Sequence, residues 1–281
     1  MKHLWQHSGP LSAATGEEPQ GGWSLAGSGR GAGKRLRLLA RLVQDLIIPP
    51  RCAGCGKIVQ DANSLCGTCW ADMDWIAKPY CSVSGLPFSY DLGNRLVSPE
   101  VLAHPPVYDR ARSVALFGST ARRMVHRLKY LDRTDLAGVM GRWMVRAGAD
   151  CLTDPQALIV PVPLHRRRLW RRRYNQSALL AKAMAEETGL AFMPDLLVRT
   201  RPTRQQVGLN EAERRMNVEG AFQLNLPDRL SLTGRTVVLI DDVWTTGATL
   251  EACCRVLRRS NAGEICIITF ARVAAGAEIT I

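Results

Sequence analysis

The sequence lacks three features that would each indicate a class of protein. No apolar run approaches the length of a membrane-spanning helix, and the amino terminus has no apolar segment of a secretory signal. No Gly-Lys-Ser/Thr string occurs, which excludes the phosphate loop of P-loop nucleotidases. Aromatic residues make up only 6% of the chain, few for a protein that stacks many bases. We therefore expect a cytoplasmic protein that does not use a P-loop.

The cysteines indicate metal binding rather than disulfides. Their number, nine, is odd, and four of them form two Cys-x2-Cys pairs that are ten residues apart. The predicted zinc ligands are Cys52, Cys55, Cys66 and Cys69. A reactive thiol pair, the alternative, would explain one such pair but not two. The segment is too short to form its own core, so one structural zinc would stabilise it, with no open position for catalysis.

A further cysteine motif in this part of the chain is incomplete. Cys81 is followed by Ser84 at the position where a second cysteine would stand. A hydroxyl group is a poor zinc ligand, so we expect no second metal here. Cys81 is then predicted to be a small buried residue.

The most informative stretch runs from Val237 to Thr249 and reads VVLIDDVWTTGAT. Its first four residues predict a strand buried on both faces of a parallel sheet, and a helical pattern follows. Loop amides, threonine hydroxyls and a helix start suit a phosphate, and Gly247 lets the backbone approach it. Asp241 and Asp242 suit the vicinal hydroxyls of a sugar, provided that neither is buried in an ion pair. The alternative is a buried strand followed by a polar turn.

A second apolar strand, Leu158 to Pro163, leads into a strongly basic segment. Six arginines lie between residues 166 and 173. Ligands of open α/β sheets bind at the carboxyl ends of strands, and guanidinium groups suit pyrophosphate, although a solvated surface is the alternative. The formal net charge of +12 also favours anionic partners, whether phosphorylated metabolites, nucleic acid or acidic lipid.

Composition and apolar spacing predict the organisation of the chain. Residues 1–34 are predicted to be a disordered leader, and residues 35–88 an amphipathic helix followed by the cysteine ribbon. That helix, 35–48, would pack on the neighbouring domain or, alternatively, lie on a membrane surface. A linker, 89–111, precedes an α/β domain at 112–275. Further predicted strands are 113–117 and 264–271, and predicted helices are 122–130, 135–147 and 175–188.

Together these motifs resemble the ComF family, a zinc ribbon joined to a type I phosphoribosyltransferase-like domain with a central, mostly parallel sheet. The resemblance rests on the four-cysteine ribbon, LKY (128–130), PVPLHRRR, YNQSALLA, RxRxTRQQVGLNExERRxNVxGAF and DDVWTTGAT, and covers roughly residues 47–271. Many relatives resemble a double zinc ribbon, whereas this chain keeps one full set of four cysteines.

The resemblance implies a site for phosphoribosyl pyrophosphate (PRPP) with Mg²⁺. Asp241 and Asp242 would hold the ribose hydroxyls, or water on Mg²⁺, as the catalytic pair. The implied substrate-binding residues are Thr245, Thr246, Gly247, Ala248 and Thr249 for the 5′-phosphate, and His165, Arg166 and Arg167 for the pyrophosphate. Residues 201–217 would form a mobile lid, since polar stretches of this length in compact domains commonly serve as lids.

Two functions follow from the resemblance. The first is a phosphoribosyltransferase that displaces pyrophosphate at the anomeric carbon. The second is a protein that handles single-stranded DNA during DNA uptake in competent bacteria, with the same fold as a non-catalytic binding module. The intact acidic pair and threonine loop favour the first, and the arginine cluster and net positive charge favour the second.

Overall fold

The computed structural model describes residues 49–62, 64–88, 96–201, 216, 220–227 and 230–274. The predicted leader, the helix at 35–48 and most of the predicted lid lie outside these residues. The chain divides into two compact units, residues 1–49 and 50–281, and the description below concerns the second. Among the described residues, no helix is both long and apolar enough to span a bilayer. The predicted domain boundaries at residues 34, 88 and 111 stay predictions.

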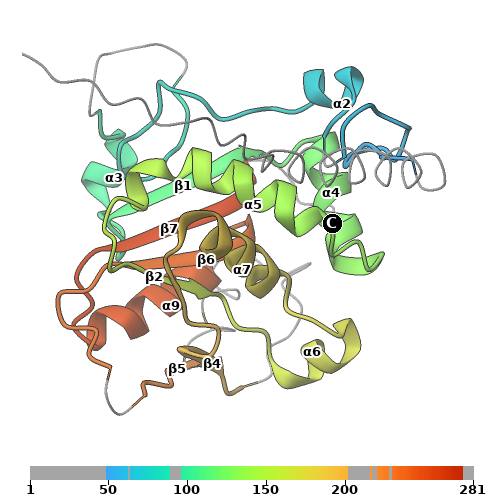
Figure 1. Cartoon of the computed structure of the whole chain (residues 1–281). Coiled ribbons are helices and arrows are strands. Elements are labelled where there is room, and N and C mark those ends of the chain that lie inside the picture. Colours follow the sequence, from blue (N-terminus) through green and yellow to red (C-terminus); the bar gives the residue numbers. More distant parts are fainter. Residues whose placement is uncertain are drawn as a thin grey trace, which may run out of the picture. The chain divides into compact units, whose positions relative to one another are not determined.

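The centre of the second unit is a five-stranded parallel sheet in the order β1-β7-β6-β2-β3 (Figure 1). Its strands are β1 (Arg110–Leu116), β2 (Leu158–Pro161), β3 (Ala191–Phe192), β6 (Val237–Trp244) and β7 (Ile265–Arg272). Every residue of β2 and β7 is buried, as expected for strands that are covered on both faces. The predicted α/β fold class is therefore confirmed.

Helices cover one face of the sheet, and a helix with a small second sheet covers the other (Figure 1). The first layer contains α4 (Ser119–Tyr130), α5 (Leu136–Ala147) and α7 (Gln176–Thr188); the second contains α9 (Ala248–Arg259) and the antiparallel pair β4 (Leu197–Arg199) and β5 (Phe222–Leu224). Side chains of β6 alternate between the layers, with Val238 and Ile240 in the first and Val237 and Leu239 in the second.

The cysteine-rich part packs on the sheet through aromatic side chains. It contains α2 (Gly67–Ala71), and a bridge between Trp75 and Ala115 joins it to β1. The Trp75 ring lies 4.5 Å from the ring of Trp70 and 5.2 Å from that of Trp143 on α5, centroid to centroid. The short helices α3 (Pro99–Ala103) and η1 (Ala149–Cys151) complete the described elements of the connecting segments. The ribbon is thus part of the same packed unit as the sheet.

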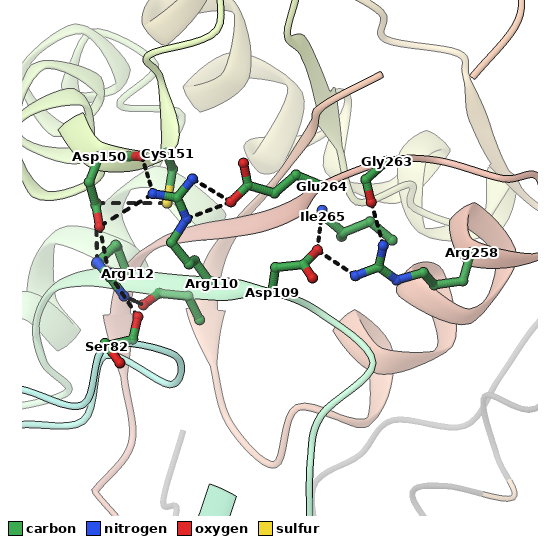
Figure 2. A network of polar contacts seen from close by, with 11 residues as sticks. Ser82, Asp109, Arg110, Arg112, Asp150, Cys151, Arg258, Gly263, Glu264 and Ile265 are labelled. Atoms are coloured by element: carbon green, nitrogen blue, oxygen red, sulfur yellow. Dashed lines mark hydrogen bonds and ion pairs between the residues drawn. The ribbon is translucent and has the colours of Figure 1, made fainter. Parts of the chain in front are cut away.

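Arginine side chains at the start of β1 form a network of hydrogen bonds and ion pairs with neighbouring segments (Figure 2). Arg112 makes two hydrogen bonds to the Asp150 carboxylate, at 3.2 and 2.5 Å, and donates to the Ser82 carbonyl at 2.9 Å. Arg110 donates from Nε to Glu264 Oε1 at 2.6 Å. These bonds lie at the amino ends of the strands, so they hold the fold together at the edge opposite the predicted site.

Two elements differ from the sequence-based prediction. Strand β6 continues through the acidic pair to Trp244, because its pairing with β7 persists as far as Trp244 and Arg272. The arginine-rich segment after β2 forms a helix, α6 (Arg166–Arg172), where no helix was predicted. Arginine and leucine are good helix formers, and His165 caps this helix by accepting a hydrogen bond at Nδ1 from the Arg167 amide at 3.2 Å.

Candidate functional site

The predicted site lies where the connections of the sheet diverge. From β2 the chain runs outward to β3 through α6 and α7, whereas from β6 it runs to β7 through α9 on the opposite face. Strands β2 and β6 are neighbours in register, with Pro161 opposite Ile240. Open α/β sheets bind their ligands in the crevice at such a switch point. The segments predicted to bind pyrophosphate and phosphate therefore begin beside each other.

The two aspartates of β6 have different surroundings. Asp241 is half-buried, and its Oδ1 accepts hydrogen bonds from Ser177 Oγ at 2.7 Å and from the Asp242 amide at 2.9 Å. Asp242 is buried, and its Oδ2 lies 2.6 Å from Lys129 Nζ, with the lysine side chain only 15% exposed. The expectation that neither carboxylate is buried in an ion pair is therefore wrong for Asp242. Among the described residues, the hydrogen-bond donors to the Asp241 carboxylate are a hydroxyl and an amide.

The pKa of Asp241 is raised by its position. Burial disfavours the charged carboxylate, and the neighbouring Asp242 adds repulsion, so that the pKa of Asp241 rises to about 7. The Ser177 hydroxyl and the Lys129 ammonium group oppose this rise. Near neutral pH, a ligand or a nearby charge can therefore change the ionisation of Asp241.

The loop after β6 leads into a helix whose start has no side-chain cap. Gly247 is the first residue of this cap region and has a left-handed backbone, with φ of +80°. This backbone conformation favours glycine, and a Cβ at this position would also lie in tight contact with the Trp244 ring, 3.0 Å from Nε1. The Thr246 hydroxyl oxygen is buried and has no hydrogen-bond partner among the described residues. The uncapped helix amides and this hydroxyl together suit a phosphate group.

Lys129 and Ser177 are site residues that the sequence reasoning missed. They contact Asp242 and Asp241 respectively, at the distances given above. Lys129 belongs to the LKY string and Ser177 to the YNQSALLA string, both of which carried the family resemblance. Both are polar residues of a family motif to which the sequence analysis had assigned no role, and this was the signal that could have identified them as site residues.

The residues just before Ser177 form hydrogen bonds that connect α4, the end of β2 and the start of α7 beside β6. Tyr174 donates from its hydroxyl to the Leu128 carbonyl of α4 at 2.6 Å. Asn175 donates from its amide to the Val162 carbonyl after β2 at 3.0 Å, and its Oδ1 caps α7 by accepting from the Ser177 amide at 3.1 Å. These bonds place Lys129 of α4 and Ser177 of α7 against the acidic pair.

The residues predicted to bind pyrophosphate lie at the start of α6. His165 is half-buried, Arg166 and Arg167 are exposed, and the helix ends at Arg173 in a left-handed conformation. Trp170 of the same helix is 91% exposed. The structure thus places a cationic helix next to the end of β2, and contact of its residues with pyrophosphate stays a prediction.

A buried arginine adds positive charge from the other face of the sheet. Arg199 of β4 is 8% exposed, and its guanidinium carbon lies 5.2 Å from the centroid of the Phe222 ring. Burial, together with repulsion from Arg168, lowers its pKa to about 10, while Asp241 favours its charged form. Arg199 therefore interacts electrostatically with both the arginine helix and the acidic pair.

The four predicted zinc ligands form one cluster. The Sγ atoms of Cys52, Cys55, Cys66 and Cys69 all lie within 4.8 Å of one another. The Cys55 and Cys66 sulfurs are 3.7 Å apart, which matches the sulfur–sulfur edge of about 3.8 Å in a tetrahedron with Zn–S bonds of ~2.3 Å. The donor set and spacing fit a structural zinc ion, as predicted.

Two arginines of α4 hold this cluster. Arg127 donates from Nη1 to the carbonyls of Cys52, Ala53 and Gly54 at 3.4, 3.2 and 3.3 Å. Arg123 lies 3.8 Å from the Cys69 sulfur. Four thiolates around Zn²⁺ carry a net charge of −2, which these guanidinium groups partly offset. The same helix carries Lys129, so it connects the zinc cluster to the acidic pair.

The incomplete knuckle keeps the backbone of a metal site. Cys81 is fully buried, as predicted, and its sulfur accepts hydrogen bonds from the amides of Ser84 and Ser98 at 3.4 and 3.3 Å. Arg112 and Arg272 donate to the carbonyls of Ser82 and Ser84. Hydrogen bonds from the start and the end of the sheet thus hold this loop.

Comparison with known proteins agrees with this architecture. Residues 43–100 match the model of the double zinc ribbon domain, and residues 176–279 match that of the phosphoribosyl transferase domain. The chain is 31% identical over 218 residues to the DNA utilization protein YhgH of Salmonella typhimurium, covering 76% of this chain and 86% of the relative. It is 29% identical over 231 residues to Competence protein F of Haemophilus influenzae, covering 79% of this chain and 96% of that protein.

These relatives match the chain along most of their length, and they thus share the arrangement of a cysteine ribbon followed by a phosphoribosyltransferase-like domain. The LKY, YNQSALLA and DDVWTTGAT strings meet at one edge of the sheet, where Lys129, Ser177 and the acidic pair are in contact. The chain belongs to the ComF family of zinc-ribbon proteins with a phosphoribosyltransferase-like domain.

Proposed function

We propose that PRPP or a related ribose phosphate binds at the carboxyl ends of β2 and β6, in the crevice that such a switch point forms. One observation carries the proposal. The start of α9, which has no side-chain cap, follows a strand that presents the half-buried Asp241 carboxylate. Gly247 there has a left-handed backbone, and the buried Thr246 hydroxyl has no hydrogen-bond partner within the part of the chain that the structure describes. One short stretch thus contains groups that donate hydrogen bonds to a phosphate and a carboxylate that accepts them from sugar hydroxyls, as a sugar phosphate requires.

In this proposal each part of the ligand has its own residues. The 5′-phosphate takes the loop from Thr245 to Thr249, and the ribose hydroxyls donate to Asp241. Asp242 acts mainly through its ion pair, by holding Lys129 at the edge of the crevice. His165, Arg166, Arg167 and the buried Arg199 supply positive charge for the pyrophosphate.

Transfer of the phosphoribosyl group is the reaction that this arrangement would support. A nucleophile forms a bond to the anomeric carbon while the bond from that carbon to the pyrophosphate oxygen breaks, and pyrophosphate leaves with the bonding electrons. Mg²⁺, which the Asp241 carboxylate would help to hold, would offset the charge of the leaving group. The Asp241 carboxylate would stabilise the positive charge that develops on the sugar ring.

The test is the shift in thermal unfolding on addition of PRPP with Mg²⁺. We expect the wild type to be stabilised in a concentration-dependent way, and Asp241→Asn to lose most of this shift. Asp195→Asn removes an exposed carboxylate after β3 and serves as the matched control, with the wild-type shift expected. If the wild type shows no shift at millimolar PRPP, or if Asp241→Asn shifts as the wild type does, the proposal is wrong.

A second function, the handling of single-stranded DNA, is favoured by α6. Trp170 is 91% exposed on a helix that also carries the exposed Arg166 and Arg167, and an exposed aromatic ring on a cationic helix suits the stacking of bases along a charged backbone. Relatives are named DNA utilization protein and competence protein. Binding of a labelled oligothymidylate that weakens steeply with salt would support this function. Absence of binding at low salt would exclude it.

A further inference from the structure

A separate basic pocket lies between the zinc knuckle and α4. Its volume is about 530 Å³. The knuckle contributes Gly54 and Cys55, and the wall from α4 and the residue after it contributes Arg122, Arg123, His126, Arg127 and Leu131. All ionisable side chains on the helix wall are thus basic or histidine.

The zinc cluster accounts for only part of this charge. Arg127 donates hydrogen bonds to the knuckle carbonyls. Arg123 contacts the Cys69 sulfur and forms an ion pair with Asp72, whose Oδ2 lies at 3.3 Å. Arg122 and His126 are exposed and contact neither the cluster nor the knuckle backbone in the hydrogen bonds of the described residues. The His126 ring contacts the Tyr130 ring, and both side chains are exposed, so a ligand can reach them.

Aromatic rings continue from the pocket along the same helix. The His126 ring lies 4.9 Å from the Tyr130 ring, and Tyr130 is 49% exposed. The guanidinium of Arg172, from α6, lies 5.1 Å above the Tyr130 ring and donates to its hydroxyl at 3.1 Å. From Arg122 to Tyr130 the helix rises about 12 Å. The result is a strip in which two ring-bearing side chains, His126 and Tyr130, lie between Arg122 and Arg172.

We infer that this strip, formed by Arg122, His126, Tyr130 and Arg172, binds single-stranded nucleic acid. The inference rests on the second proposed function and gives it a surface outside the PRPP crevice. Arg122 contacts a phosphate, while His126 and Tyr130 offer ring faces to unpaired bases. A duplex keeps its bases stacked inside, and a polyphosphate has none, so both should bind less well than a single strand.

The test uses the full-length, zinc-loaded protein and a fluorescently labelled oligothymidylate of 20 residues. We expect Arg122→Glu to weaken binding about tenfold at 0.1 M salt and to reduce the slope of log K against log salt by about 0.7 for each phosphate that the arginine neutralises. His126→Ala should weaken binding severalfold without a change in that slope. Arg146→Glu, which reverses an exposed charge on α5, is the matched control and should bind within twofold of the wild type.

The outcomes separate the inference from the function on which it rests. If the wild type does not bind the oligonucleotide, the second function and the inference both fail. If the wild type binds and Arg122→Glu binds equally well, only the inference fails. Equal competition by polyphosphate or duplex would also overturn it. Zinc content of one ion per chain and an unchanged PRPP-induced thermal shift in Arg122→Glu would show that the weaker binding is confined to the strip.

Discussion

Replacement of Lys129 by methionine tests whether the ion pair with Asp242 organises the crevice. The two charged atoms are 2.6 Å apart, and the side chains of Lys129 and Asp242 are only 15% and 8% exposed. Methionine keeps most of the apolar stem of the lysine but removes the charge. The Asp242 carboxylate would then remain buried without its counter-ion.

We expect a large loss of folding stability, because Asp242 stays buried after its counter-ion is removed. Removal of one member of a buried ion pair typically costs about 3–5 kcal/mol. For a chain of this size each kcal/mol lowers the melting temperature by about 2–4 °C, so we expect a decrease of roughly 6–20 °C. The double variant Lys129→Met with Asp242→Asn should recover part of this stability, because no unpaired buried charge remains.

The assay is urea unfolding followed by tryptophan fluorescence, with thermal melting as a second probe. Lys182→Met provides the control, because Lys182 pairs with Glu186 at 3.8 Å on the exposed face of α7. That surface pair should contribute less than about 1 kcal/mol. If Lys129→Met is as stable as Lys182→Met, or if the double variant is destabilised by the sum of both single effects, the ion pair does not have the role assigned to it.

Three further predictions concern pH, zinc and the glycine turn. Because the pKa of Asp241 is raised to about 7 and the sugar hydroxyls require its carboxylate, calorimetric PRPP affinity should rise from about pH 6 to about pH 8 and level off above, and Asp241→Asn should abolish this dependence. Removal of zinc with a strong chelator should lower the melting temperature measured by circular dichroism; an unchanged melt of metal-free protein would contradict a structural zinc. Gly247→Ala should cost about 1–2 kcal/mol in urea unfolding, because φ there is +80°, and should weaken PRPP binding; wild-type stability would contradict the turn geometry.

The predictable parts of the fold are those determined by a local pattern of residues along the chain. Runs such as residues 237–240 and 264–271 are apolar at every or nearly every position, and only a strand covered on both faces buries them all. The helix predicted after residue 249 is α9, whose buried residues include Leu250, Cys253, Cys254 and Leu257 at helical spacing. The zinc cluster was predictable because two short Cys-x2-Cys turns determine the positions of four sulfurs.

The parts that were not predictable depend on contacts between distant segments. Lys129 and Asp242 are brought together only by the packing of α4 against the end of β6, which no local pattern encodes. The same holds for Arg199, whose burial and proximity to Asp241 depend on the second small sheet. Helix α6 was missed because a run of arginines was interpreted by its charge, although its helix propensity and the capping His165 favour a helix.

A crystal structure of the protein soaked with PRPP and Mg²⁺ tests the central claim most directly. The account predicts that the 5′-phosphate lies within hydrogen-bond distance of the first amides of α9 and of the Thr246 hydroxyl, with the ribose hydroxyls on Asp241. A ligand bound elsewhere on the chain, or an empty crevice at saturating ligand, would contradict it.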